Sequence, residues 1–233
     1  MQITLFGYGT MGRLVEKIAE ARGHRIAARI DGPEDPVPFE QTDVAIDFSS
    51  PEAAFGNISR CLEAGVPVIS GTTGWLDRYD DACALCREHA GAFLYASNFS
   101  LGVNLFFALN AHLAQLMQQA PGYRAEIEET HHTRKLDAPS GTAITLAEGL
   151  IENSAYTAWT QQDPKEGELP VHSLRLGDTP GTHRVSYVSE VDRIDIIHTA
   201  HNREGFATGA VVAAEWILGK KGIFGMQDVL NLR

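Results

Sequence analysis

The densest group of side chains that could do chemistry lies in residues 126–143, E-I-E-E-T-H-H-T-R-K-L-D-A-P-S-G-T-A. Two adjacent histidines, His131 and His132, are followed closely by Arg134 and Lys135. The whole chain has a formal net charge of −11, so these basic side chains reverse the sign locally. A small basic cluster on an acidic protein favours a small anionic ligand over nucleic acid or another polyanion.

The residues around this cluster predict a short strand, a loop and a helix. Residues 125–128 alternate as a strand does, Pro139-Ser140-Gly141 combines a break with a cap, and residues 142–150 favour a helix. The first N–H groups of a helix lack intrahelical partners and lie at the positive end of its dipole, which makes this an anion site. The alternative is a surface loop whose charges are only solvated.

A metal site is a weaker interpretation of the same residues. Neighbouring side chains on a strand point to opposite faces, and no further ligand pattern accompanies His131 and His132, so we expect no metal. Cys83 and Cys86 form a C-x-x-C within an expected helix, and we interpret them as packing residues because no second pair completes a zinc site. Three cysteines, an odd number, argue against a disulfide framework.

The N-terminal residues predict a dinucleotide site. The apolar run at 3–6 precedes the pattern G-x-G-x-x-G at Gly7, Gly9 and Gly12, and residues 13–22 follow as an amphipathic helix. In this strand–helix context the first glycine permits a tight turn, the second lets a pyrophosphate approach the backbone, and the third allows close packing. We therefore expect contacts to the cofactor from Gly7, Tyr8, Gly9, Thr10, Met11 and Gly12.

Asp31 bears on the choice of cofactor. It ends the expected strand 25–30, where an acid can accept hydrogen bonds from the adenosine ribose and repel the additional phosphate of NADP. The next residue is Gly32, and Arg29 precedes the acid. We expect NADH to be preferred over NADPH. The alternative is that Asp31 only serves the turn Asp31-Gly32-Pro33.

The rest of the chain predicts an α/β protein of two parts. Strands at 43–48, 66–70 and 92–96 alternate with helices at 51–64 and 76–89, which is typical of a parallel sheet. A helix at 106–119 follows. Residues 153–169 are interpreted as irregular, and three segments alternate in the manner of antiparallel strands: 171–176, 182–188 and 193–199. His183 and His198 are interpreted as residues of a strand face rather than as catalysts. A last helix is expected at 207–218.

Length and composition exclude several classes. The 233 residues are 44% hydrophobic and 21% charged, which is ordinary for a globular protein. No apolar run approaches the ~18 residues of a membrane span, and no secretion signal is evident. We expect a cytoplasmic protein without membrane or nucleic-acid partners.

The string at 126–143 closely resembles the signature of the dihydrodipicolinate reductase family, E-x-x-E-x-H-H-x-x-K-x-D-x-P-S-G-T-A. The second acid is Glu129 or Glu128, depending on how the strand is registered. Further segments are similar to family patterns: D-F-S at 47–49, G-T-T-G at 71–74, S-N-F-S-L-G-V-N at 97–104, G-D-T-P-G-T-H at 177–183 and the ending at 222–230. The glycine loop is one residue tighter, and the loop at 32–42 shorter, than in the relatives it resembles.

This resemblance implies hydride transfer from NADH, or less readily NADPH, to 4-hydroxy-tetrahydrodipicolinate. This cyclic dicarboxylate is reduced to tetrahydrodipicolinate with loss of water, in diaminopimelate and lysine biosynthesis. His132, Lys135 and the backbone of Ser140, Gly141 and Thr142 would hold a carboxylate. His131 would be the general acid and Lys135 would stabilise the developing charge; the exchanged roles explain the sequence almost as well.

The resemblance also implies how the chain is organised. A Rossmann-type dinucleotide-binding domain, residues 1–98 and 207–233, would accompany an α+β substrate and tetramerisation domain, residues 99–206, with a mixed or antiparallel open sheet. We expect a homotetramer, and domain closure about residues 97–101 and 202–206. Further cofactor contacts would come from Phe48, Gly71, Thr72, Thr73, Ala96, Ser97, Asn98, Phe99 and Arg203.

Two rival functions remain open at this stage. Another dehydrogenase of the same build could act on an amino acid or a semialdehyde, although the H-H-x-x-K pattern and the second substrate carboxylate argue against it. A dinucleotide-sensing protein without turnover would keep the glycine loop, and it could lose His131 or Lys135, yet both are present.

Overall fold

The computed structural model of the chain describes residues 1–32, 35–120 and 122–232. It consists of two compact units. The first comprises Met1–Leu101 together with Glu204–Arg233, and the second comprises Gly102–Arg203. The chain therefore passes twice between the units, and each unit is described separately below.

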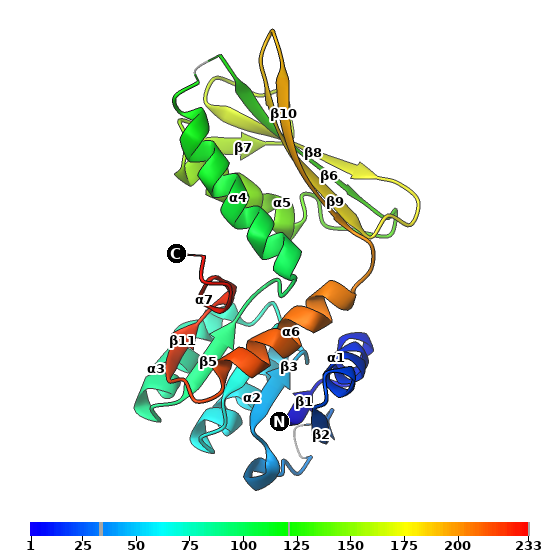
Figure 1. The fold of residues 1–233 in the computed structure, drawn as a ribbon, viewed down its shortest axis with the longest axis vertical. Coiled ribbons are helices and arrows are strands. Elements are labelled where there is room, and N and C mark those ends of the chain that lie inside the picture. The colour runs from blue at the N-terminus through cyan, green and yellow to red at the C-terminus, as the bar shows by residue number, and fades with distance from the viewer. Residues whose placement is uncertain (33–34, 121, 233) are drawn as a thin grey trace. The chain divides into compact units, whose positions relative to one another are not determined.

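The first unit is built on a parallel sheet with the strand order β11-β5-β4-β3-β1-β2 (Figure 1). Its strands are β1 (Gln2–Phe6), β2 (Arg25–Ile30), β3 (Val44–Asp47), β4 (Val68–Ser70), β5 (Ala92–Tyr95) and β11 (Gly222–Phe224). The order reverses at β1, so the carboxyl ends of β1 and β3 meet at a topological switch point. This sheet confirms the Rossmann-type fold expected from the sequence.

Helices cover both faces of this sheet (Figure 1). The helices α1 (Thr10–Ala21) and α6 (Glu204–Ile217) share one apolar core with the sheet, while α2 (Pro51–Glu63) and α3 (Tyr79–Glu88) share the other. Cys83 and Cys86 are buried in that second core. The short helix α7 (Met226–Val229) completes the unit, and 3₁₀ turns lie at Phe39–Gln41 and Leu76–Arg78. Strands covered on both faces are mostly apolar, and all four residues of β3, Val44–Asp47, are buried, with the Asp47 carboxylate at its end hydrogen-bonded.

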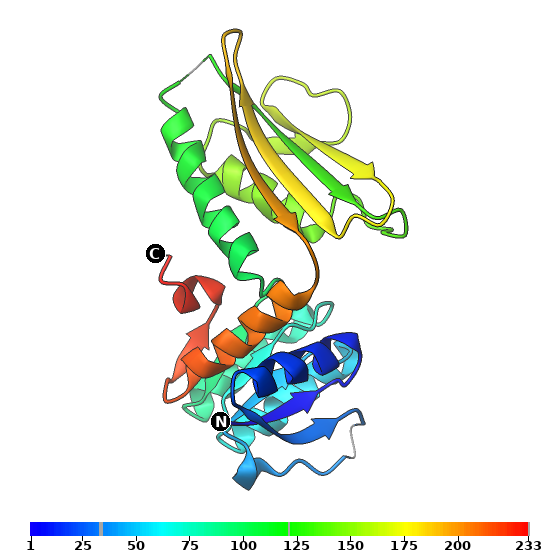
Figure 2. The same cartoon turned by 45° about the vertical axis from the view of Figure 1, so that its right-hand side comes forward.

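The second unit is a sheet with helices on one face only (Figure 2). The strand order is β10-β9-β6-β8-β7. The strands are β6 (Arg124–His131), β7 (Ala158–Thr160), β8 (Glu168–Arg175), β9 (Gly181–Val188) and β10 (Arg193–Ala200), and the helices are α4 (Leu101–Met117) and α5 (Gly141–Glu152). Alternate side chains of the sheet form an apolar core with both helices. Among the described residues no helix covers the opposite face.

Two sequence expectations for this unit were wrong in part. The segment at 171–176 does not pair as an antiparallel strand: β8 runs parallel to β6 and to β7, while β9 pairs antiparallel with β6 and β10. The sheet is therefore mixed. Helix α5 returns the chain to the end of the sheet where β6 began, so that β7 and β8 can run parallel to β6. The irregular region at 153–169 contains the short strand β7.

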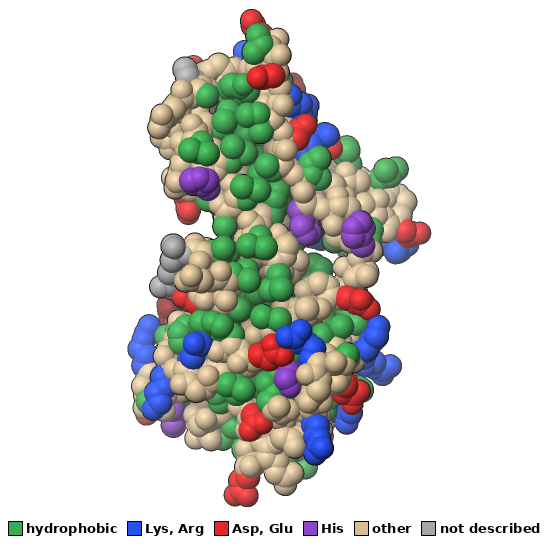
Figure 3. Space-filling view, in the orientation of Figure 1, with side chains coloured by type: hydrophobic (Ala, Val, Ile, Leu, Met, Phe, Trp, Pro, Cys, Tyr) green, Lys and Arg blue, Asp and Glu red, His purple; other side chains and the backbone are tan. Residues whose placement is uncertain are grey.

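Helix α4 begins at Leu101, five residues earlier than the sequence suggested, and its exposed side is unusually apolar. Leu105, Leu109 and Leu116 are each about half exposed. Figure 3 shows apolar side chains gathered in the region of α4 on the face in view. Within the described residues, no helix is both long and apolar enough to cross a membrane.

Candidate active site

The register of β6 selects which acid points into the second unit. Its residues alternate in burial, with Glu129 and His131 on the inner face and Glu126 and Glu128 on the outer face. Glu128 instead forms an ion pair with Arg184 of β9, with 2.8 Å between Nη2 and Oε1. Of the two acids that the sequence left open, Glu129 is therefore the one beside His131.

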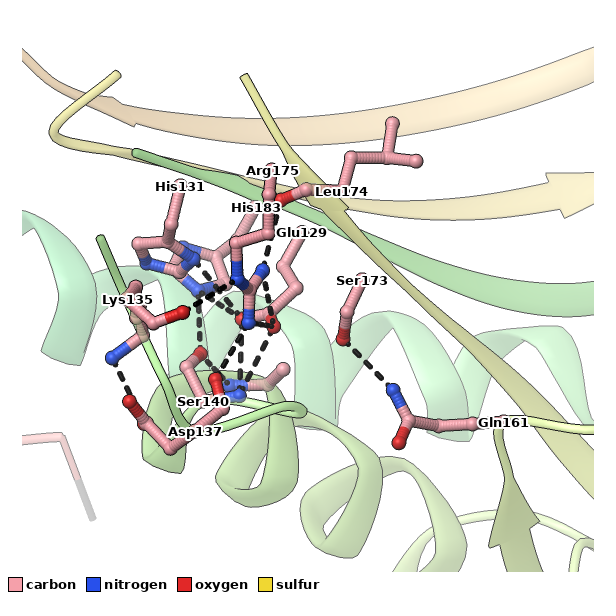
Figure 4. A network of polar contacts seen from close by, with 11 residues as sticks. Glu129, His131, Lys135, Asp137, Ser140, Gln161, Ser173, Leu174, Arg175 and His183 are labelled. Atoms are coloured by element: carbon pink, nitrogen blue, oxygen red, sulfur yellow. Dashed lines mark hydrogen bonds and ion pairs between the residues drawn. The ribbon is translucent and has the colours of Figure 1, made fainter. Parts of the chain in front are cut away.

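Glu129 is the centre of a buried polar cluster (Figure 4). Nδ1 of His131 lies 3.3 Å from Oε2 of Glu129, and Nε2 of His183 lies 3.6 Å from the same oxygen. The two imidazole rings stand edge to face, with their centroids 5.0 Å apart. A Cβ added to Gly181 would lie only 3.1 Å from Nε2 of His131, so the ring requires a glycine there. Three groups that exchange protons thus share one enclosed space.

The cluster contains a stable negative charge. Burial alone would raise the pKa of the Glu129 carboxyl, but contacts from His131, His183, Ser140 and Ser173 outweigh it and hold this pKa well below its usual range. Burial lowers the pKa of His183, and the contact with Glu129 opposes this only in part. At neutral pH Glu129 is therefore ionised and His183 is neutral.

Ser140 joins the cluster to the start of α5. As the N-cap it accepts a hydrogen bond from the N–H of Ala143 at 3.2 Å, the usual role of serine at this position. Its own N–H donates to both carboxylate oxygens of Glu129 at 3.1 Å, and its hydroxyl lies 3.2 Å from Nε2 of His183. A Cβ at Gly141 would meet nothing within 4 Å, so the helix start is open to an approaching group.

The loop between β6 and α5 carries Lys135. Its Nζ donates to Oδ2 of Asp137 at 2.8 Å, and its side chain is 22% exposed. This hydrogen bond lowers the pKa of Asp137, which is ionised. Arg175, at the end of β8, lies against the loop. It contacts Glu129 and two carbonyls of the loop (Figure 4). The ammonium group thus has a defined position at the rim of the buried cluster.

The cluster also contains a set of donors that a transition metal could bind. One atom each of Glu129, His131 and His183 lies within 4.8 Å of the others. The same carboxylate already receives the guanidinium of Arg175 at 3.3 Å, and a second cation would compete with it. We therefore interpret the cluster as one that holds protons.

The glycine loop of the first unit is shaped to admit a ligand at one position only. Gly7 has φ +83°, and a Cβ there would lie 2.2 Å from the carbonyl oxygen of Phe48. A Cβ at Gly12 would lie 2.2 Å from the carbonyl oxygen of Gly7. At Gly9, the N-cap of α1, nothing lies within 4 Å of the added atom. The backbone of Gly9 at the helix N-terminus can therefore receive a phosphate group, as a dinucleotide requires.

Two acids control the charges beside this loop. Asp31 accepts a hydrogen bond from the N–H of Tyr8 at 2.6 Å, which fixes its carboxylate at the end of β2. Glu16, on α1, accepts hydrogen bonds from Nε and Nη2 of Arg29, one edge of the guanidinium, and from the hydroxyl of Tyr8. The hydrogen bond from Arg29 lowers the pKa of Glu16, so the pair is ionised. Arg29 is thus committed to Glu16.

Asp47, which is fully buried at the end of β3, anchors the loops after β3 and β4 through hydrogen bonds. Its carboxylate accepts hydrogen bonds from Ser49, Asn57, Ser70 and Thr72, all between 2.6 and 3.1 Å. Burial raises the pKa of this carboxyl against the effect of those donors. The hydroxyl of Thr72 is therefore engaged within the fold, and a contact from Thr72 to a cofactor would use its backbone.

Aromatic packing closes the same edge. The rings of Phe48 and Phe99 meet edge to face with centroids 5.7 Å apart, and a Cβ at Gly71 would lie 2.2 Å from the Phe48 ring. Phe99 is only 2% exposed. Oδ1 of Asn98 accepts from the N–H of Ser100 at 2.9 Å, which forms a local turn just before α4. Gly71, Thr73, Ala96 and Ser97 retain some exposure.

The structure divides the expected site residues between the two units. The glycine loop, Asp31 and the loops after β3, β4 and β5 belong to the first, whereas His131, His132, Lys135 and the start of α5 belong to the second. Arg203 is the last residue of the second unit. Arg175 was not among the site residues expected from the sequence, and His183 was expected to be a strand-face residue. His183 does lie on a strand face: it is on the inner face of β9, beside His131 on the inner face of the neighbouring strand β6.

A Rossmann-type unit joined to a unit with a buried proton-exchanging cluster defines a class, the oxidoreductases that use a nicotinamide dinucleotide. The sequence matches the family profile described as dihydrodipicolinate reductase, N-terminus, over residues 1–99, and that described as dihydrodipicolinate reductase, C-terminus, over residues 102–230. The chain therefore belongs to the dihydrodipicolinate reductase family, as the resemblance of its motifs suggested.

Individual relatives agree with this assignment. The 4-hydroxy-tetrahydrodipicolinate reductase of Christiangramia forsetii is 52% identical over 99% of this chain and 98% of its own length. That of Alkaliphilus metalliredigens is 35% identical over the full length of both chains. Among solved structures, a dipicolinate-bound dihydrodipicolinate reductase from Paenisporosarcina sp. TG-14 shares the fold, with a TM-score of 0.77, 23% identity and 97% of each chain covered.

Proposed function

We infer that this chain reduces 4-hydroxy-tetrahydrodipicolinate to tetrahydrodipicolinate, with loss of water, in diaminopimelate and lysine biosynthesis. The observation that carries this inference is the buried Glu129–His131–His183 cluster, with Lys135 at its rim and an open helix start beside it. A cyclic dicarboxylate needs cationic and N–H contacts for a carboxylate and a proton donor for the ring, and this arrangement offers both.

The chemistry divides between cofactor and protein. The bound nicotinamide supplies a hydride to the ring, and the negative charge that results must take up a proton. His131 is our general acid: Glu129 lies beside Nδ1 and orients the ring, which leaves Nε2 to exchange the proton with the substrate. Lys135 stabilises the developing charge. The exchanged roles of His131 and Lys135 remain an alternative within the same proposal.

Binding of the substrate is assigned to the start of α5. His132, Lys135 and the backbone of Ser140, Gly141 and Thr142 hold one carboxylate, which lies at the positive end of the helix dipole. Lys135 exchanges its partner Asp137 for this carboxylate when substrate binds. The open space beside Gly141 supports this assignment.

NADH is the cofactor that we propose is preferred. Asp31 repels a 2′-phosphate, and its fixed position at the end of β2 suits hydrogen bonds to ribose hydroxyls. The nearest arginine on the same strand, Arg29, is ion-paired with Glu16 through Nε and Nη2, and this pair balances part of its charge. The glycine loop, the loops after β3, β4 and β5, and Arg203 are assigned to the cofactor as the sequence suggested.

We also propose a homotetramer. The apolar face of residues 171–188 packs against α4 and α5 of the same chain, so it does not serve contacts between subunits. The support that remains is the opposite face of the sheet, which the described helices leave uncovered. Its side chains are largely polar, with ion pairs that link Glu128 to Arg184 and Glu126 to Arg193.

The test is nicotinamide oxidation at 340 nm with substrate made freshly from pyruvate and aspartate semialdehyde. We expect turnover by the native protein, faster with NADH than with NADPH. Replacing His131 or Lys135 by alanine should lower kcat/KM by about 10²–10⁴-fold, while NADH still binds. His89→Ala is the matched control, because His89 is an exposed histidine at the end of α3, outside both proposed sites. NADH binding without any turnover by the native protein would instead favour a dinucleotide sensor.

A further inference from the structure

We propose that Arg175 is a positioning residue that fixes the loop carrying Lys135 to the buried carboxylate of Glu129. The proposal rests on the function inferred above, since it assigns Arg175 to that reaction. Arg175 is the last residue of β8 and lies opposite His131 in the parallel pairing of β8 with β6. Its side chain is 21% exposed, so the guanidinium is mostly enclosed.

Every N–H group of this guanidinium has an acceptor. Nη2 donates to the carbonyl of Asp137 at 2.6 Å, and Nε donates to the carbonyl of Lys135 at 3.3 Å. Nη1 donates to the carbonyl of Leu174 at 2.8 Å, and both Nη atoms reach Oε1 of Glu129 at 3.3 and 3.4 Å. A planar guanidinium can satisfy such a divergent set of acceptors, whereas a single ammonium group cannot.

The loop depends on these bonds because few others hold it. Between His131 and Ser140, the backbone hydrogen bonds of the described residues are Leu176 N–H to the carbonyl of His131, Thr133 N–H to Gly177 and Lys135 N–H to His132. They fix the first half of the loop. In the second half, Leu136 is 97% exposed, and the carbonyls on either side of it are the two that Arg175 binds.

Arg175 therefore acts on both candidate catalytic groups without touching the reacting atoms. Through the two carbonyls it sets the position of the Lys135 backbone and hence the reach of the ammonium group. Through Oε1 it balances part of the charge of Glu129, whose other oxygen faces His131. A displacement of about 1 Å at such a site is enough to cost on the order of 10²-fold in rate.

The experiment compares Arg175→Ala and Arg175→Lys with Arg134→Ala. Arg134 belongs to the same loop and pairs with Asp178 in the open, with its side chain 72% exposed, so it controls for the loss of a loop arginine. We expect kcat/KM to fall on the order of 10²-fold in Arg175→Ala, by less in Arg175→Lys, and by less than about twofold in Arg134→Ala. Guanidinium ion at millimolar, non-denaturing concentration should restore part of the activity of Arg175→Ala.

Amide hydrogen exchange gives a readout that does not need turnover. In Arg175→Ala the amide of Lys135, which donates to the carbonyl of His132 in the native loop, should exchange about tenfold faster or more, while those of α5 stay protected. If Arg175→Ala does not fold, Arg175→Lys decides by the same exchange and kinetic measurements. Unchanged loop exchange, or lost activity that guanidinium does not restore, would overturn the proposal. If amide exchange in the loop is faster in Arg175→Ala but the native protein shows no turnover, the inferred function is wrong, and the positioning of the loop by Arg175 still holds.

Discussion

Two histidines in one cluster differ in what their surroundings do to them. His131 meets Glu129 through Nδ1, whereas His183 is enclosed on β9 and meets the same carboxylate through Nε2. Burial lowers the pKa of His183 and the adjacent carboxylate does not restore it. The geometry also distinguishes the two rings, because Glu129 lies nearer to His131, at 3.3 Å, than to His183, at 3.6 Å.

This difference has a consequence for stability against pH. Because the pKa of His183 is lower in the folded protein than its ordinary 6.5, the unfolded chain binds the proton more readily. The contribution of His183 to the free energy of unfolding is therefore complete above pH 6.5, and it is lost as the pH falls towards the pKa of His183 in the folded protein. We expect His183→Asn to lose less stability than the native protein between pH 7 and pH 5, measured by urea unfolding.

Two other groups must be separated from this effect. His198 also has a lowered pKa, so both histidines contribute to the native slope, and the difference between native protein and His183→Asn isolates His183. Glu129 has a depressed pKa as well, and its contribution is lost only below its ordinary value of 4.5, outside this interval. Parallel stability curves for the native protein and His183→Asn would contradict a neutral, buried His183.

At the scale of elements, the turn from β1 to α1 shows how one motif serves both fold and ligand. Gly7 is required by its positive φ and by the Phe48 carbonyl, but the space at Gly9 is empty. Gly7→Ala should lower the free energy of unfolding by more than about 2 kcal/mol. Gly9→Ala should have the same unfolding temperature as the native protein. It should bind NADH at least about tenfold more weakly, because its methyl group lies where the pyrophosphate approaches.

Thermal unfolding and NADH titration of the two variants form the test. Each variant is the control for the other, since both add one methyl group to the same loop. If Gly9→Ala bound NADH as tightly as the native protein, the pyrophosphate would not lie on this backbone. A fully stable Gly7→Ala would contradict the close approach of the Phe48 carbonyl.

Local patterns predicted the elements better than their pairing. The strands of the parallel sheet followed from short apolar runs between helices, and β2 was predicted with its observed bounds, Arg25–Ile30. The parallel direction of β8 was not, because alternation indicates a half-buried strand without revealing its neighbour. The short strands β7 and β11 were also missed, because their sequences, A-W-T and G-I-F, do not stand in a longer apolar run as the three residues of β4 do.

The site shows the same limit. His131, Lys135 and Ser140 lie within ten residues, so the sequence alone grouped them. Arg175 lies 46 residues from Glu129, and His183 lies 43 residues from Ser140, and only the pairing of β8 and β9 with β6 brings them together. The resemblance of residues 177–183 to a family pattern drew attention to this turn, but it contained no information on which side chains face β6.

At the scale of the whole molecule, the second unit presents a sheet face that α4 and α5 leave open (Figure 2). On this face Ile197 of β10 is 57% exposed and lies opposite Arg184 of β9. We propose that the tetramer forms here, which would bury the ion pairs of the face together with Ile197. A charge placed at Ile197 would then be buried beside Glu128 and Asp195 without a new partner, and such burial is strongly unfavourable.

We therefore expect Ile197→Glu to dissociate the tetramer. Light scattering coupled to size exclusion should give a native mass of about four times the 25.4 kDa of one chain, and one or two chains for the variant. Leu109→Glu is the matched control, since Leu109 is 50% exposed but lies on α4, on the other side of the sheet, and should leave the mass unchanged. A monomeric native protein would exclude the tetramer, and a tetramer lost in Leu109→Glu but kept in Ile197→Glu would move the interface to α4.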